Sequence, residues 1–85
     1  MSDQEIASEV ERVVRRHLDV PDRALDDSTH FVDDLGADSL AVVDLTLALE
    51  EAFDIDIADE DVERLRTVKD VIDYVEQQLA ARRSS

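Results

Sequence analysis

Residues 34–53 read DLGADSLAVVDLTLALEEAF, and most of this stretch predicts the central helix of a small helical protein. Apolar residues recur at helical spacing from Ser39 to Phe53, so we expect one helix over these residues. At about 100° per residue, the broad apolar face of this helix must point into a core. That face holds Ala41, Val42, Leu45, Ala48, Leu49, Ala52 and Phe53.

The opposite side of this helix carries a second, narrower apolar stripe. The stripe consists of Leu40, Val43 and Leu47, and it is flanked by the acids Asp44, Glu50 and Glu51. A bundle this small cannot easily bury both sides of one helix, so the stripe is expected to be exposed, as a docking surface for a partner would be. The alternative is that a neighbouring helix or loop covers it and that the acids are ordinary solvated charges.

Capping boxes mark the starts of two further helices. Ser2 with Glu5 predicts a first helix over about residues 3–17, and Thr67 with Asp70 predicts a last helix. Both contain apolar residues at helical spacing: Ile6, Val10, Val13 and Val14 in the first, and Val68, Val71, Ile72, Val75 and Leu79 in the last.

A long, Asp-rich connection over residues 19–38 separates the first two helices. The first helix should stop before Pro21, because the residue before a proline avoids the helical conformation. A single turn is expected at Phe31–Leu35, with the Phe and the Leu fixed to the core. A short third helix should follow Asp59, which can serve as its N-cap.

These elements predict an all-α, four-helix bundle with three longer helices, one short third helix and one long loop. The stretch Phe53–Ile57 alternates in polarity, but it is short and has no partner strand. We expect residues 1–85 to form a single domain, ordered over about 3–80, with a frayed tail at 81–85.

The net charge of −14 is concentrated in the middle of the chain. Residues 24–63 contain fourteen acids and no basic residue, so they carry a charge equal to that of the whole chain. Such a field repels nucleic acid and anionic lipid and attracts basic protein partners; the alternative is that it serves solubility alone. The start of the chain shows no signal-peptide pattern, and no apolar run approaches a membrane span. We expect a cytoplasmic monomer that binds neither nucleic acid nor membrane.

Three roles are open to Ser39, which stands at the start of the central helix. It could cap that helix, although Asp38 could cap it equally well and Val42 gives no capping box. A catalytic serine needs an oriented base, and nothing orients His30, so we expect no catalytic residues. The third role is covalent modification of an accessible hydroxyl, beside Gly36, which lets another backbone approach.

Metal binding is not indicated by these residues. His17 and His30 have no partners at metal-ligand spacing. The acids at positions 54–61 lack the pattern of a calcium-binding EF-hand and could hold divalent cations only loosely. We expect no specific metal site.

Three motifs make the chain resemble the acyl carrier proteins of fatty-acid and polyketide synthesis. They are LGADSL at 35–40, LALEEAFDIDI at 47–57 and TVKDVIDYV at 67–75, and the resemblance extends from Ile6 to Leu79. It implies a four-helix bundle that is not an enzyme. The motif serine, here Ser39, would carry a covalent 4′-phosphopantetheine arm whose thiol holds acyl groups as thioesters. A chain without cysteine would thus receive its thiol on a prosthetic group.

The resemblance also implies roles for other residues. Gly36, Asp38 and Leu40 would form the motif context that the phosphopantetheinyl transferase, or holo-synthase, recognises. Basic patches on ketosynthases, acyltransferases and other acyl-processing enzymes would meet the outer face of the central helix, which is Leu40, Val43, Asp44, Leu47, Glu50 and Glu51. The acyl chain would lie among Leu45, Leu49, Phe53, Ile57, Leu65 and Ile72.

The chain departs from the family pattern at surface positions that affect partner choice. Ala41 stands where an acidic or polar residue is frequent, and Ala58 stands where a proline is frequent. Positive charge at Arg64 and Arg66 lies where acids are usual. The main alternative is a specialised aminoacyl or peptidyl carrier. A remoter one is an acidic, calcium-responsive adaptor that functions without Ser39.

Because the central carboxylates repel one another, the stability of the fold should depend on salt. We expect the melting temperature to rise by about 5 °C from low to physiological ionic strength, which corresponds to about 1 kcal/mol for a domain of this size. Thermal denaturation followed by circular dichroism measures this shift. A melting temperature that does not change with ionic strength would contradict the expectation.

Overall fold

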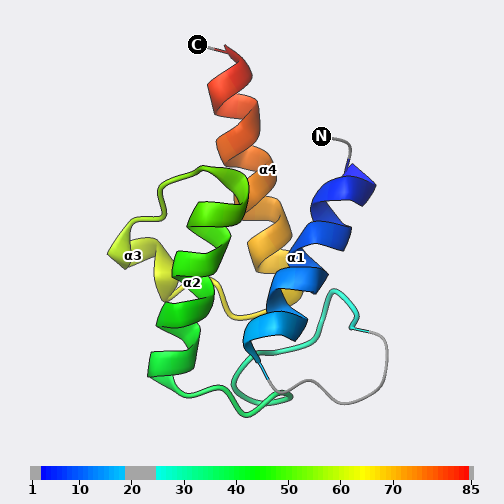
Figure 1. Cartoon of the computed structure of the whole chain (residues 1–85), viewed down its shortest axis with the longest axis vertical. Helices are drawn as coiled ribbons and strands as arrows, with labels where there is room; N and C mark the ends of the chain where they lie inside the picture. The colour runs from blue at the N-terminus through cyan, green and yellow to red at the C-terminus, as the bar shows by residue number, and fades with distance from the viewer. Residues whose placement is uncertain (1–2, 19–24, 85) are drawn as a thin grey trace.

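The computed structural model describes residues 3–18 and 25–84, which contain four helices (Figure 1). They are α1 (Asp3–His17), α2 (Ser39–Phe53), α3 (Asp59–Val62) and α4 (Val68–Ser84). Within these residues there is no strand, and the single β-bridge, between His30 and Thr67, is isolated. The predicted all-α fold is confirmed, and α1 and α2 have the predicted bounds.

The helices are arranged around α1, which packs against both α2 and α4. The short α3 lies beside α2, on the side away from α1 (Figure 1). The loop that precedes α2 crosses the end of the bundle where α2 and α4 begin (Figure 1). This arrangement leaves one side of α2 without a helix packed on it.

The hydrophobic core takes one face from each long helix. Its main members are Ile6, Val10, Val13 and Val14 of α1, Leu45, Leu49 and Phe53 of α2, and Val68, Val71 and Val75 of α4. Full burial of one such side chain stabilises a fold by about 1.5–3 kcal/mol. The other predicted α4 positions, Ile72 and Leu79, are half-buried and pack against this core.

The predicted capping box at the start of α4 is confirmed. The Asp70 N–H donates to Thr67 Oγ1 at 3.2 Å, and the Thr67 N–H donates to Asp70 Oδ2 at 3.1 Å. The corresponding prediction for α1 involves Ser2, and the predicted stop involves Pro21; both lie outside the described residues.

The long loop is held against the start of α4 by backbone hydrogen bonds. The N–H groups of Val68 and Lys69 donate to the carbonyl oxygens of Thr29 and Asp27, at 3.1 and 3.0 Å. In the opposite direction, the Phe31 N–H donates to the Arg66 carbonyl at 2.9 Å. The first N–H groups of a helix have no partner within the helix, so the loop supplies acceptors that α4 needs.

Asp26 organises the beginning of this paired segment. Its Oδ1 accepts hydrogen bonds from the Ser28 hydroxyl at 2.8 Å and from the Thr29 hydroxyl at 3.1 Å. These bonds, that of Ser28 first, hold the pKa of the Asp26 carboxyl below its usual value. The carboxylate is therefore the form that fits this turn.

The segment between α2 and α4 differs from the prediction at the start of α3. Ala58 occupies the N-cap position, without a side-chain hydrogen bond, and Asp59 is already the first helical residue. The prediction that Asp59 caps this helix is wrong. The short helix is instead tied to α4 by the Tyr74 hydroxyl, which donates to Asp61 Oδ2 at 2.9 Å. Burial, followed by this bond, raises the pKa of Tyr74.

The alternating stretch Phe53–Ile57 is an extended connection after α2. Phe53, Ile55 and Ile57 are buried, whereas the intervening acids are exposed. Asp54 ends the helix in the left-handed conformation, with φ of 54°. Its carbonyl oxygen accepts a hydrogen bond from Arg82, near the end of α4. That helix continues to Ser84.

Phe31 fixes the long loop to the core, as predicted, and only 1% of its surface is exposed; Leu35, the other predicted anchor, is half-buried against the core. Replacing Phe31 with Ala should reduce the free energy of unfolding by about 3–5 kcal/mol, because it leaves a cavity under the loop. The neighbouring Val32 is 50% exposed, so Val32→Ala is the matched control and should have little effect. Urea denaturation measures both; an equal loss in the two variants would contradict the role given to Phe31.

Candidate functional site

The start of α2 leaves the Ser39 side chain exposed and unengaged. Asp38 is the N-cap: its Oδ1 accepts the Ala41 N–H at 2.8 Å, and its carbonyl oxygen accepts the Val42 N–H at 3.0 Å. Within the described part of the chain, no group forms a hydrogen bond with the Ser39 hydroxyl. The possibility that Ser39 caps the helix is therefore excluded, and its hydroxyl is available for another role.

The turn before α2 determines where Ser39 lies. The predicted single turn over Phe31–Leu35 is present, and the N–H groups of Asp34 and Leu35 donate to the His30 carbonyl oxygen. Gly36 leaves this turn with φ of 69°, a conformation that side chains other than glycine rarely adopt. Next to it, the Ala37 N–H donates to the Phe31 carbonyl at 2.9 Å, which carries the chain back to the core.

His30 is the cap of this turn. Its Nδ1 accepts the N–H groups of Val32 and Asp33, at 3.2 and 3.1 Å, and its own N–H donates to Asp34 Oδ2 at 2.7 Å. The imidazole of His30 thus caps the turn in place of the usual hydroxyl, and Asp34, four residues further on, returns a bond to the His30 N–H. A ring nitrogen that accepts two hydrogen bonds cannot serve as the base for Ser39 through the same atom, so the structure gives no support to a catalytic pair.

Ser39 borders an open groove of about 660 Å³, which we call the serine groove. Its walls come from the turn at 30–33, from the start of α2 and from residues 62–66. The apolar lining consists of Phe31, Val32, Ala37, Val42, Val43, Val62 and Leu65, and the polar lining of His30, Asp33, Asp38, Glu63 and Arg66 besides Ser39. An elongated ligand attached to Ser39 would find both apolar contacts and hydrogen-bonding groups here.

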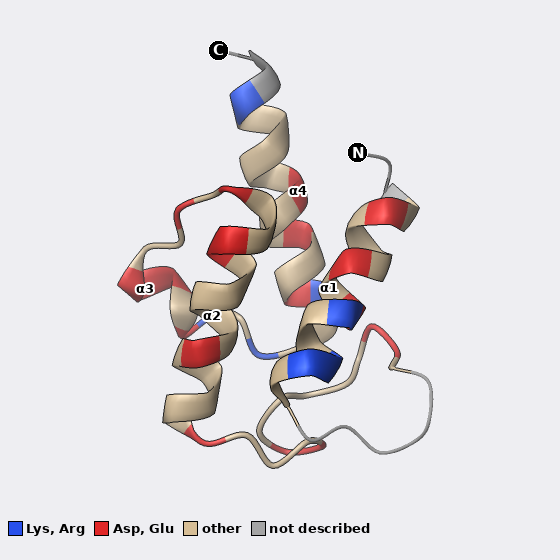
Figure 2. Ribbon diagram, viewed as in Figure 1, with Lys and Arg blue, Asp and Glu red and all other residues tan. Residues whose placement is uncertain are grey.

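The outer apolar stripe of α2 is exposed, as predicted. The exposed fractions of Leu40, Val43 and Leu47 are 69%, 46% and 57%. Neither α3 nor the long loop covers them, so the alternative of a buried stripe is excluded. Asp44 and Glu51 beside the stripe are also exposed. Acidic residues lie on α2 and α3, whereas the basic residues of α1 lie toward the C-terminal end of that helix (Figure 2).

Glu50 is used partly within the fold. It is half-buried, and its Oε2 accepts the Ile57 N–H at 3.3 Å. This bond stabilises the extended connection after α2, so Glu50 has a structural contact that Asp44 and Glu51 lack.

Two positions of α2 differ from the predicted core face. Ala52 is exposed, although it was assigned to that face. It lies with Ala48 in a cleft of about 360 Å³ between α1 and α2, because alanine side chains are too short to close this gap. Conversely, Thr46 was not assigned to the core face but is only 5% exposed, and its hydroxyl donates to the Val42 carbonyl at 2.8 Å.

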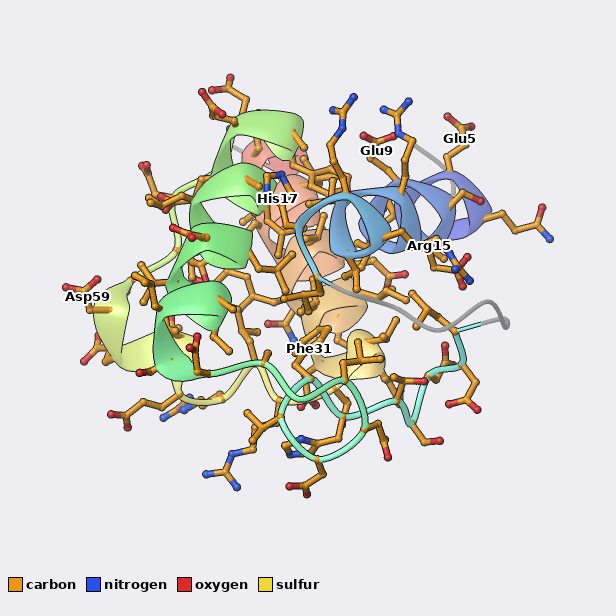
Figure 3. All side chains as sticks on the ribbon, turned by 60° about the horizontal axis from the view of Figure 1, so that its bottom comes forward. Glu5, Glu9, Arg15, His17, Phe31 and Asp59 are labelled. Carbon is orange, nitrogen blue, oxygen red and sulfur yellow. The ribbon has the colours of Figure 1, made fainter. Side chains whose placement is uncertain are left out.

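Figure 3 shows the labelled α1 residues Glu9, Arg15 and His17 on the surface of that helix, and Phe31 pointing into the bundle.

The residues expected to contact an acyl chain belong to the hydrophobic core. Leu45, Leu49, Phe53, Ile57 and Leu65 are buried, and Ile72 is half-buried against them. Of these six, Leu65 also lines the serine groove. It therefore lies where the groove meets the core, and the role of the set in acyl binding stays a prediction.

The groove residues Val32 and Arg66 were not predictable from the sequence, because a groove between distant segments leaves no periodic signal in it. Thr46 could have been found, since a helical projection places it between core positions. In the part of the chain that the structure describes, no three His, Cys, Asp or Glu residues come together to hold a metal ion. No described helix combines the length and the apolar character needed to cross a bilayer.

These features fit a phosphopantetheine arm attached to Ser39. The hydroxyl is exposed and free, the chain has no cysteine thiol of its own, and the adjoining groove combines an apolar lining with hydrogen-bond donors. The N-terminus of α2 is also a favourable place for a negatively charged phosphodiester.

Comparison with known proteins identifies the class of this domain. A family model described as the phosphopantetheine attachment site matches residues 8–75. The chain is 51% identical over 69 residues to an acyl carrier protein of Syntrophobacter fumaroxidans, a match that covers 81% of this chain and 85% of that protein. The chain belongs to the acyl carrier protein family. It is a carrier of acyl intermediates, and its cofactor is 4′-phosphopantetheine.

The division of labour between Asp38 and Ser39 can be tested by stability. Asp38→Ala should lower the free energy of unfolding by about 1 kcal/mol, because the Ala41 N–H loses its acceptor. Ser39→Ala should change it far less, since the Ser39 hydroxyl makes no hydrogen bond. Urea denaturation of both variants makes the comparison; a larger loss for Ser39→Ala would show that the serine is the cap.

Proposed function

We propose that Ser39 is the attachment site of the 4′-phosphopantetheine arm. The observation that carries this proposal is a free, exposed serine hydroxyl at the start of a helix that the neighbouring Asp38 already caps. Ser39 also lies within the residues that match the phosphopantetheine attachment family. Gly36, Asp38 and Leu40 form the context that the phosphopantetheinyl transferase recognises around it.

The attachment reaction requires little of this chain beyond an accessible oxygen. The Ser39 Oγ forms a bond to the coenzyme A phosphorus that is linked to pantetheine. The hydroxyl proton of Ser39 passes to the transferase, and the nucleotide half of coenzyme A leaves. The attached arm supplies the thiol on which acyl groups are held as thioesters. The chain itself orients Ser39 and presents it to other enzymes, and it catalyses no reaction.

The outer face of α2 is the proposed docking surface for these enzymes. Leu40, Val43 and Leu47 provide the apolar contacts, and Asp44 and Glu51 attract Arg and Lys on the partner. Glu50 contributes less than the sequence suggested, because its carboxylate already bonds to the Ile57 N–H. Partners of this kind include ketosynthases and acyltransferases.

The acyl intermediates belong to fatty acid or polyketide synthesis. We propose that the acyl chain reaches the core past Leu65, which lies both in the serine groove and in the set that includes Leu45 and Leu49. The half-buried Ile72, which packs against the same core, would line the far part of that path.

Modification can be read directly from intact mass. Incubation of the protein with coenzyme A, magnesium and a phosphopantetheinyl transferase should add the mass of one phosphopantetheine, and Ser39→Ala should add none. Ser8→Ala is the matched control, because it removes an exposed serine on α1 and should be modified like the original chain. Modification of a folded Ser39→Ala variant would refute Ser39 as the site.

The docking surface can be tested by reversing one charge. Asp44→Lys should slow modification by the transferase severalfold at low ionic strength and less at high ionic strength, because exposed charges act mainly on association rates. Asp73→Lys makes the same change of charge on α4 and should have a much smaller effect. The rate of mass increase measures both; equal rates for the two variants would remove Asp44 from the interface.

A further inference from the structure

The cleft between α1 and α2 takes no part in the attachment of the arm. We call it the α1–α2 cleft; its volume is about 360 Å³. It is lined by Glu9, Arg12, Val13, Arg16 and His17 of α1 and by Ala48, Glu51 and Ala52 of α2. None of these residues lines the serine groove. A ligand in the α1–α2 cleft would therefore leave Ser39 uncovered.

The floor of the cleft is apolar, and its side chains are too short to fill it. Val13 is 7% exposed and Ala48 is half-buried against the core, whereas Ala52 is exposed. Larger side chains normally fill the space between two packed helices, because protein interiors are close-packed. Two alanines about one helical turn apart leave a depression here that fits an apolar side chain from another molecule.

The two rims of the cleft carry opposite charges that the fold leaves unpaired. On the α1 rim, Arg12 Nη2 lies 2.6 Å from Glu9 Oε1, but Arg16 forms no ion pair with any described residue. On the α2 rim, Glu51 forms none within the same part of the chain. Both Arg16 and Glu51 are exposed. This charge pattern fits an occupant with a carboxylate on one side and a basic group on the other.

The last turn of α1 makes its rim basic. It contains Arg15, Arg16 and His17, and residues 12–17 include no acid. His17 lies at the end of α1 nearest α2, whereas Arg15 lies on the side of α1 away from α2 (Figure 3). A carboxylate that the acidic middle of the chain would repel is therefore attracted to this rim.

The mixed charge of the rims favours one kind of occupant. A polyanion such as nucleic acid would be repelled by Glu9 and Glu51. A free fatty acid could pair with Arg16, but two alanines and Val13 offer its long tail little apolar surface. An amphipathic helix supplies an apolar stripe with an acid on one flank and a base on the other.

We propose that the α1–α2 cleft is a second docking site, which binds an amphipathic helix of a partner protein. A Leu or Phe of that helix packs over Ala48 and Ala52, an acid pairs with Arg16, and a Lys or Arg pairs with Glu51. The outer stripe of α2 does not line the cleft, and only Glu51 belongs to both surfaces. The partner therefore holds the carrier while Ser39 stays open to enzymes.

The probe for this site is an end-blocked, alanine-based peptide of about 18 residues, which is long enough to be helical in water. It carries one leucine stripe, with Glu along one flank and Lys along the other. In the control peptide, Gln replaces each Glu. General attraction to a protein of net charge −14 favours the control peptide, which is more basic, whereas pairing with Arg16 favours the Glu peptide.

Binding is measured on the full chain by the shifts of backbone amide NMR signals. The Glu peptide should shift the signals of Val13, Ala48 and Ala52, and it should bind about threefold more tightly than the Gln peptide, as one exposed ion pair allows. Equal or tighter binding of the Gln peptide would overturn the proposal. So would shift changes centred on the outer stripe, or none at about 1 mM peptide.

Two variants test the contacts separately. Arg16→Met should lower the affinity for the Glu peptide about threefold and remove its advantage over the Gln peptide. Ala52→Leu fills the cleft and should weaken the binding of both peptides about tenfold. Arg15→Met and Ala81→Leu are the matched controls, because both residues are exposed outside the cleft, and they should leave the affinities unchanged. Equal losses in variants and controls of the same helical content would show that the cleft is not the site.

Modification of Ser39 distinguishes this site from the surface proposed for enzymes. Protein saturated with the Glu peptide should gain the mass of one phosphopantetheine at the same rate as free protein. A severalfold slower gain that Ala52→Leu abolishes would make the cleft part of the enzyme surface and would overturn a separate site. The peptide affinities do not depend on attachment at Ser39, so failure of that attachment would be recognised independently.

Discussion

The backbone pairing between the long loop and the start of α4 is the constraint on which the site depends. The carbonyl oxygens of Thr29 and Asp27 accept N–H groups of α4 that have no partner within the helix, and buried donors without acceptors are costly. In return, the Arg66 carbonyl accepts the Phe31 N–H, and Phe31 enters the core. These contacts fix the position of the turn that follows, and that turn places Ser39 at the start of α2.

The second helix serves two purposes because the bundle covers only part of its surface. Leu45 and Leu49 hold it to the core, whereas Leu40 and Leu47 stay in solvent for a partner. The acidic middle of the chain repels itself, which lowers stability, but the same field accelerates encounter with basic enzymes. Asp38 has two roles. Its carboxylate caps α2, which leaves the neighbouring serine hydroxyl free, and it adds to the acidic field.

Features of the fold whose signal is local were predictable from the sequence, and features that depend on contacts between distant segments were not. The exposed stripe of α2 and the availability of Ser39 followed from spacing within one helix. The assignment of Ala52 to the core was wrong, because periodicity gives the direction of a side chain but not the distance to the next helix. Asp59 was wrongly chosen as a cap because residue type was considered without the backbone geometry of Ala58. Glu50 looked like a free surface charge until its contact with the Ile57 N–H was known.

The sequence by itself determined the helices, the capping box of α4, the two faces of α2 and the family of the protein. These depend on residues three to seven positions apart, whose relation is fixed by helical geometry. Only the tertiary structure decided that Val32, Val43, Leu65 and Arg66 share one groove with Ser39, and that the loop brings His30 to it. Those residues belong to separate segments, and they meet because loop and helix satisfy one another's backbone groups and bury Phe31.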